Sequence, residues 1–338
     1  MKASSYWSND LPVMLRQVYK VMGADPPVDP KHMLIDLVEW LLRLPARSPR
    51  RVHRSWMART KILSPLEIQG LEQVATGLKA GGNMSPFLGD ASRKIRQRSR
   101  EVSKSGITIG KKRWQPDWMF SDWGIHHFHL GPDLEAKGEK VLRSARVLFA
   151  YLTQEDAYLL DVLPHRRTDG GIAWAQKGVL ETLCREWPSV MERYELRGIL
   201  GPSPLFEPTS AQVHSLRQAG VSSPGMIDGK AYMGPGLGLA SDRSSTRAVK
   251  LSGEIRWELH RMEKLFRDSA DNAQAHLFVA ADASVGYFIP SRDAAISCVP
   301  AYTSDCRMTW FFQRLLREVP IFRGAPQGAV WLRQGIGQ

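Results

Sequence analysis

Arg146-Val-Leu-Phe-Ala-Tyr-Leu152 and Tyr158-Leu-Leu-Asp-Val-Leu163 are two apolar runs separated by the polar segment Gln154-Glu-Asp156. Runs of this length, rich in branched and aromatic side chains and bounded by polar turn residues, are typical of β-strands. We therefore expect an antiparallel hairpin, with a third strand over residues 125–130. A helix with an apolar face over residues 179–191 is expected to pack on this sheet.

The segment that precedes the sheet predicts two helices. Apolar residues recur at helical spacing from Leu34 to Leu42, and this helix is expected to end before Pro45. A second helix is expected to begin after Ser64, which can form a capping box with Glu67, and to end at Gly81-Gly82.

The C-terminal part predicts a separate module. Helical spacing covers about residues 247–266 and 308–319, and apolar runs at 277–280 and 285–289 predict a second hairpin. The whole sequence therefore predicts an α+β protein with a small antiparallel sheet and flanking helices. It divides into a basic helical region (1–113), an α+β core (114–198) and a C-terminal module of helices and a hairpin (199–338).

Composition narrows the class of protein. The 338 residues carry a formal net charge of +12, with an isoelectric point near 9.8. No run of about 18 apolar residues exists, so we expect no membrane span. Three widely spaced cysteines argue against a disulfide framework, and we expect a cytoplasmic protein. A strongly positive field attracts polyanions, and nucleic acid is the commonest of them in that compartment.

Two basic stretches flank the second predicted helix, at residues 43–61 and 93–113. A solvated connector is one interpretation of each. The other is a surface that faces phosphates. On the second interpretation, the residues expected to contact RNA, alone or on the ribosome, are Arg50, Arg51, Arg54, Arg96, Arg98, Lys111, Lys112 and Arg113.

Histidines concentrate around the predicted sheet. In a strand over 125–130, His127 and His129 share one face while His126 points the other way. His165 ends a later strand, and neighbouring strands lie about 4.8 Å apart, so we expect His129 and His165 to meet on one face. Two imidazoles suit RNA cleavage without a metal: one deprotonates the 2′-hydroxyl and the other protonates the leaving 5′-oxygen. The cations expected to stabilise the phosphorane are Arg143, Arg146, Arg166 and Arg167, with Arg146 and Arg166 preferred.

The order His129-Leu-Gly-Pro-Asp133, Arg146-Val-Leu-Phe-Ala-Tyr151 and Tyr158-Leu-Leu-Asp-Val-Leu-Pro-His165 resembles the core of the RelE superfamily of toxins, especially its YafQ-like branch. The resemblance implies metal-independent mRNA cleavage, often on the ribosome, and a neutralising antitoxin protein as partner. It places His129 and His165 in the acid/base positions and Asp133 in a supporting position. Apart from the resemblance, we take His127 and Asp161 as second choices, as orienting or ligating groups.

Our first prediction is a metal-independent endoribonuclease that acts as a toxin or phage-defence effector and needs no cofactor. Two alternatives stay open. One is a metal-dependent hydrolase in which His127, His129 and His165 bind zinc or manganese with Asp161 or Asp122. The other is a non-catalytic basic adaptor that binds nucleic acid or protein.

Overall fold

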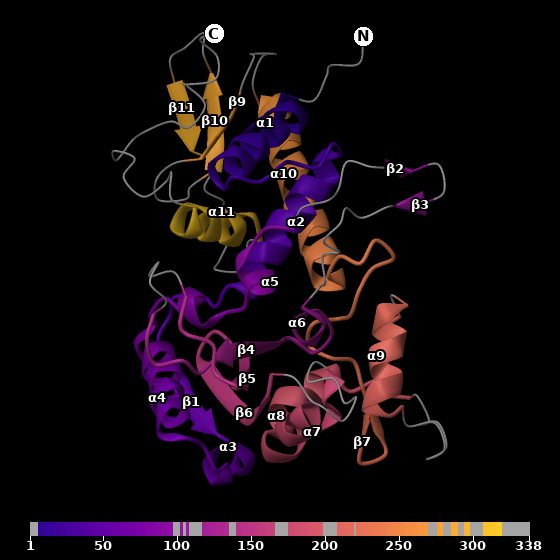
Figure 1. Ribbon diagram of the computed structural model, residues 1–338. Coiled ribbons are helices and arrows are strands. Elements are labelled where there is room, and N and C mark those ends of the chain that lie inside the picture. Colours follow the sequence, from indigo (N-terminus) through magenta and orange to yellow (C-terminus); the bar gives the residue numbers. More distant parts are fainter. Residues whose placement is uncertain are drawn as a thin grey trace. The chain divides into compact units, whose positions relative to one another are not determined.

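The computed structural model describes residues 6–96, 102–103, 106–107, 117–134, 140–165, 175–198, 208–219, 221–269, 276–279, 285–289, 294–297 and 307–319. They form two compact units, each built from separate stretches of sequence. One comprises Leu42–Lys94 and Trp114–Arg247, and the other comprises Met1–Leu41, Ile95–Arg113 and Ala248–Gln338. Both contain helices and strands, as expected of the α+β class (Figure 1). The three consecutive regions predicted from the sequence do not coincide with these units, and their boundaries stay predictions.

The first unit holds a four-stranded sheet in the order β1-β6-β5-β4. β5 (Arg146–Leu152) and β6 (Asp156–Pro164) form the predicted antiparallel hairpin, and β4 (Ile125–His129) pairs antiparallel with β5. The fourth strand, β1 (Arg51–Arg54), was not predicted and runs parallel to β6, so the sheet is mixed. Four residues, two of them arginine, carry too little apolar signal to mark a strand.

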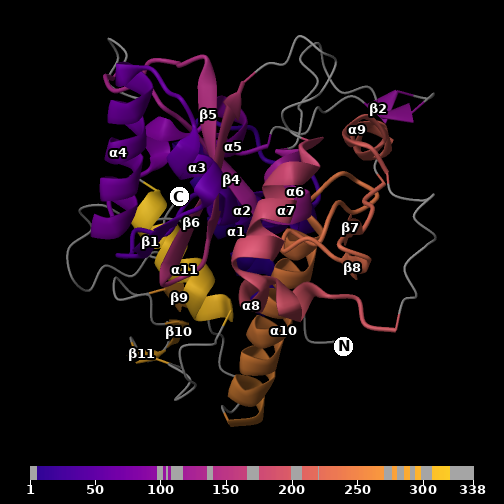
Figure 2. The same ribbon diagram turned by 90° about the horizontal axis from the view of Figure 1, so that it is seen from below.

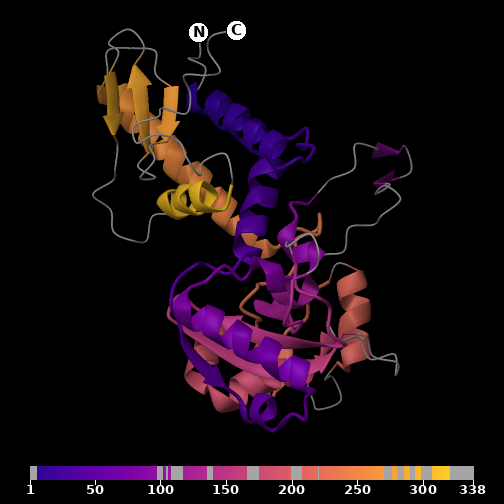
Figure 3. The ribbon, with the colours of Figure 1, turned by 60° about the vertical axis from the view of Figure 1, so that its left-hand side comes forward.

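Helices cover both faces of this sheet, with α4 and α7 on opposite sides of it in Figure 2. On one face, Ile125, Val147 and Phe149 pack with buried residues of α7 (Lys177–Glu186), chiefly Val179, Leu180 and Leu183. On the other lies α4 (Pro65–Ala80), which Figure 3 shows running across the sheet. These helices close the core around the strands.

The capping signals predicted for α4 are present. The Ser64 hydroxyl accepts a hydrogen bond from the Glu67 N–H, and the Glu67 carboxylate accepts one from the Ser64 N–H at 3.0 Å. Gly81 ends the helix in the left-handed conformation, with φ of 71°, which a residue without a Cβ adopts at no steric cost.

Short elements complete this unit. They are α3 (Trp56–Thr60), α5 (Asp90–Arg93), α6 (Trp118–Trp123), α8 (Pro188–Met191), α9 (Ser210–Gln218) and the hairpin of β7 (Gly225–Ile227) and β8 (Lys230–Tyr232). Single 3-10 turns span Ser85–Phe87 and Glu192–Tyr194. A buried ion pair of 2.7 Å joins Arg217 of α9 to Asp122 of α6.

The second unit is mainly helical. It contains α1 (Tyr6–Val21), α2 (Pro30–Arg43, to Leu41), α10 (Thr246–Ser269, from Ala248) and α11 (Arg307–Glu318). β9 (His276–Val279), β10 (Val285–Ile289) and β11 (Ala294–Ser297) form an antiparallel sheet, which confirms the predicted hairpin and adds a third strand. β2 (Val102–Ser103) and β3 (Gly106–Ile107) form a separate short pair. Among the described helices, none has the length and apolar content that crossing a membrane requires.

Candidate active site

His127 and His129 lie on the same face of β4, as the alternation of side chains along a strand requires. They are opposite Phe149 and Val147 of β5, and their ring centroids are 6.2 Å apart. His126 points to the other face, where its ring lies 4.7 Å from the ring of Phe120.

His165 joins these two histidines from the end of β6. Its ring stacks on that of His129, with centroids 5.2 Å apart and planes 29° from parallel. The expected meeting of the two imidazoles is present, but the predicted route was wrong, because β4 and β6 are not neighbours and β5 lies between them. Because β4 and β6 are both antiparallel to β5, they end on the same side of the sheet. There the backbone N–H of His165 donates a hydrogen bond to the Ala145 carbonyl.

Asp117 adds a carboxylate to this cluster. Its Oδ2 lies 3.3 Å from His127 Nδ1 and accepts a hydrogen bond of 2.7 Å from the Ser92 hydroxyl, while Oδ1 accepts one from the Phe120 N–H. Burial opposes ionisation of Asp117, but the charge and hydrogen bonding of His127, together with the bonds from Ser92 and Phe120, hold its pKa below the ordinary value. Asp117 therefore stays ionised and orients the imidazole of His127.

His129 is the most enclosed member of the stacked pair. It is 4% exposed, and burial, reinforced by the neighbouring His127, His165 and Arg143, lowers its pKa to about 3. Its Nδ1 has no hydrogen-bond partner among the described residues. At neutral pH, His129 is therefore an uncharged imidazole, and the same surroundings make it a weak base.

Gly89 faces two of the histidines. A Cβ placed on this glycine would lie 3.2 Å from His127 Nε2 and 3.7 Å from His129 Nε2, so both nitrogens point at the same stretch of backbone. The next residue, Asp90, pairs with Lys140 at 2.8 Å and with Arg143 at 3.7 Å. We call Asp117, His127, His129 and His165 the histidine cluster. The charge of Arg143 acts on His129 of this cluster, and Lys140 shares the Asp90 carboxylate with Arg143.

Three of the other predicted catalytic residues lie away from the histidine cluster. Arg146 projects from the opposite face to Val147, donates to the Ile62 carbonyl and lies 4.0 Å from Glu67. Its role at the phosphate stays a prediction, and Arg143 is the arginine whose charge acts on His129. Asp161 is held by Lys61 at 2.9 Å. Asp133 is exposed on the loop after β4. Arg166 and Arg167 lie outside the described residues.

The metal alternative gains no support from the geometry. Within the described ranges, no group of three or more His, Cys, Asp or Glu side chains is arranged to hold a metal ion. The carboxylates proposed as further ligands are already bound to cations, Asp161 to Lys61 and Asp122 to Arg217.

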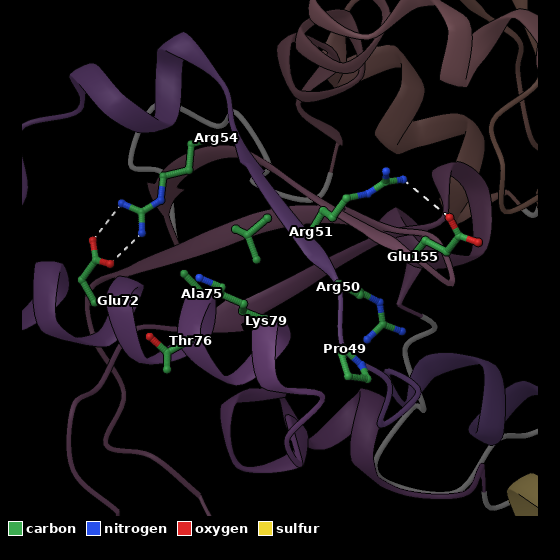
Figure 4. A pocket seen from close by; sticks show the side chains of 10 residues that line it. Pro49, Arg50, Arg51, Arg54, Glu72, Ala75, Thr76, Lys79 and Glu155 are labelled. Carbon is green, nitrogen blue, oxygen red and sulfur yellow. Dashed lines mark hydrogen bonds and ion pairs between the residues drawn. The ribbon is translucent and has the colours of Figure 1, made fainter.

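Three of the arginines predicted to contact nucleic acid lie at or beside β1 and bind groups of the protein, while their contact with nucleic acid stays a prediction. The Arg50 guanidinium donates to the carbonyls of Thr153, Ala46 and Ser48. Arg51 forms a bidentate pair with Asp156, and Arg54 forms one with Glu72. All three arginines line a groove of about 730 Å³ between β1 and α4, where the pairs of Arg54 with Glu72 and of Arg51 with Glu155 span its two ends (Figure 4). Of the other predicted contacts, Arg96 is buried, and Arg98, Lys111, Lys112 and Arg113 lie outside the described residues.

Comparison of the chain with protein-family models, with curated proteins and with solved structures finds no match.

Asp117 and Gly89 were not among the predicted site residues. Asp117 had a local signal, since an aspartate directly before the apolar run of Trp118–Trp123 suits a helix N-cap, but that signal says nothing of a histidine partner. Gly89 had no signal, because its proximity to β4 depends on tertiary packing.

Proposed function

We propose that this chain is a metal-independent endoribonuclease in which His129 and His165 share the acid/base work. The observation that carries the proposal is their stacking at 5.2 Å at one edge of the sheet, beside the oriented His127. The resemblance of residues 129–165 to the RelE superfamily supports the same chemistry. It is also the sole support for a toxin or phage-defence role, for action on the ribosome and for a neutralising antitoxin.

The reaction assigns a different state to each imidazole. The neutral His129 takes the proton of a 2′-hydroxyl, and the 2′-oxygen attacks the adjacent phosphorus. The bond from phosphorus to the 5′-oxygen breaks, and protonated His165 gives its proton to that oxygen. The products are a 2′,3′-cyclic phosphate and a 5′-hydroxyl. Arg143 and Lys140 stabilise the charge that develops on the phosphorane oxygens.

The exposure of the two histidines determines how RNA can reach them. His129 is 4% exposed, whereas His165 is half-buried, so RNA reaches the pair from the side of His165. A phosphate held there brings negative charge next to His129. Such a charge favours protonation and raises the pKa of His129 toward the range useful for proton transfer.

One observation favours a second function. The same burial of His129 is what a basic adaptor would show if its histidines only packed inside the fold. The two functions differ in one measurable property, since an adaptor binds RNA without breaking it.

The first prediction concerns RNA cleavage. The purified chain should degrade RNA, alone or with ribosomes, in the presence of EDTA, and His165→Ala should lower the rate by about two to four orders of magnitude. His129→Ala should do the same. The measurement is the initial rate of cleavage of a labelled RNA at neutral pH.

A matched control is His32→Ala, because His32 is a partly exposed histidine of α2 and is not a member of the histidine cluster. This variant should cleave at the wild-type rate. Full activity in both His129→Ala and His165→Ala would contradict the acid/base assignment. RNA binding without cleavage by the wild-type chain would favour the adaptor.

A further inference from the structure

The second unit carries a basic helix surface that none of the sequence predictions included. Along α10 from Lys250 to Lys264, every exposed charged residue is basic. These cations are Lys250, Arg256, Arg261 and Lys264, and the exposed Trp257 and His260 lie among them. We call these six residues the α10 stripe, and the helix is the orange one labelled in Figure 1.

The acidic residues of α10 do not neutralise the whole stripe. Glu258 accepts hydrogen bonds from the backbone N–H groups of Arg307 and Met308 at the start of α11. Glu254 is shared between Arg307 and Lys250, at 3.6 and 3.7 Å. Arg256 and Lys264 have no recorded ion pair within the described part of the chain. Their charges therefore face solvent.

Trp257 gives the stripe an aromatic face. Its side chain is 61% exposed, an unusual state for so large an apolar group, and the Arg261 guanidinium lies 5.7 Å from its ring centroid. Beside it lies a groove of about 630 Å³ lined by Leu11, Leu15 and Leu34 from α1 and α2, by Trp257 and Arg256 of α10 and by other residues. Trp257 thus presents an exposed aromatic surface at the rim of this groove, on which a planar ring can stack.

The length of the stripe points to a chain of anions. Fourteen residues of helix separate Lys250 from Lys264, which is about 21 Å at about 1.5 Å per residue. Cations recur at roughly one per turn over this length, whereas a single anionic group would need a compact pocket. A polymer with regularly spaced phosphates and stackable bases matches the cations, the tryptophan and the groove together.

We propose that the α10 stripe binds single-stranded RNA, with phosphates against its cations and a base against Trp257. The choice of RNA as the nucleic acid rests on the proposed function, but binding at the stripe does not require cleavage at the histidine cluster. An acidic protein surface would pair with the cations. It would not supply a planar ring to stack on Trp257, so RNA accounts for more of the stripe.

The test uses the full chain and a fluorescent single strand of roughly twelve nucleotides, methylated at every 2′-oxygen so that the proposed chemistry cannot break it. Binding is followed by fluorescence anisotropy at several salt concentrations. Trp257→Ala should weaken binding about tenfold, the loss expected for one stacked base. The double variant Arg256→Glu with Lys264→Glu should also reduce the slope of log affinity against log salt by about 1.4, at about 0.7 per lost phosphate contact.

The matched control reverses two other exposed cations, Lys20 of α1 and Lys79 of α4, to glutamate. It carries the same change in net charge and should bind far more tightly than the α10 double variant. Equal weakening by both double variants would overturn the proposal, because overall charge alone would then explain binding. Unchanged RNA affinity in the α10 variants, or preferential binding of the stripe to vesicles of anionic phospholipid, would overturn it as well. Because the probe cannot be cleaved, none of these results depends on the proposed nuclease activity.

Discussion

At the scale of single residues, the three neighbouring histidines of β4 have different surroundings. His127 is oriented by Asp117 and His129 stacks on His165, while His126 lies between aromatic rings, 4.7 Å from Phe120 and 6.1 Å from Phe128. Neither nitrogen of the His126 ring makes a hydrogen bond within the described residues. The alternation of a strand predicted this separation of His126 from the other two. The carboxylate beside His127 could not be predicted, because Asp117 reaches it through the packing of α6.

His126 makes the stability of the fold depend on pH. Burial lowers its pKa to about 3, against an ordinary value of 6.5. Between these values the unfolded chain binds a proton that the folded chain does not, so the free energy of unfolding falls as the pH falls below about 6.5. From about pH 7.5 to about pH 5, His126 alone should cost the folded state about 2 kcal/mol.

His126→Phe should remove this part of the pH dependence and should stabilise the protein at low pH, because it replaces an unpaired polar ring with an apolar one. Urea denaturation at the two pH values measures both effects. His32→Phe, at a partly exposed site in the second unit, is the control and should keep the wild-type dependence. An unchanged pH dependence in His126→Phe would show that other groups cause it.

At the scale of elements, α4 fixes the end of β4 that carries His129. The Cα of Gly70 lies so close to this strand that an added Cβ would fall 2.0 Å from the Leu130 carbonyl oxygen, far inside contact distance. The capping box of α4 was predicted, since Ser64 and Glu67 form a local signal. Nothing in the sequence pattern marks Gly70, because its role comes from a strand 60 residues away. β1 was not predicted for a different reason. Its four residues are too few and too basic to give a recognisable strand pattern in the sequence.

Gly70→Ala should therefore force α4 away from β4, lower the free energy of unfolding by about 1–3 kcal/mol and reduce RNA cleavage through displacement of His129. Gly178→Ala is the matched control. Gly178 lies in α7 with no atom near the position of its absent Cβ, so this change should stabilise the protein by about 0.5–1 kcal/mol. Thermal or urea unfolding of the two variants gives the comparison. Equal stability of both would contradict the close packing of α4 on β4.

At the scale of the whole molecule, the net charge of +12 predicts that the protein binds a polyanion, but it does not predict which residues form the binding surface. In the structure, carbonyls bind Arg50 and carboxylates bind Arg51 and Arg54, although Arg50 alone of the three is buried. A further group of exposed cations, without a carboxylate for each of them, lies along α10, in a unit assembled from three separate stretches of the chain. The order of residues in the sequence does not reveal which arginines acquire partners, since the partners of Arg50 and Arg51 lie more than 100 residues away.

The chemical identity of the RNA ends tests the central claim most directly. The chain should cut RNA in the presence of EDTA and leave a 2′,3′-cyclic phosphate and a 5′-hydroxyl at each cut, because the 2′-oxygen is the nucleophile. Mass spectrometry of the fragments identifies these ends. Absence of cleavage, or 3′-hydroxyl and 5′-phosphate ends that form only with a divalent cation, would contradict the assignment of the histidine cluster.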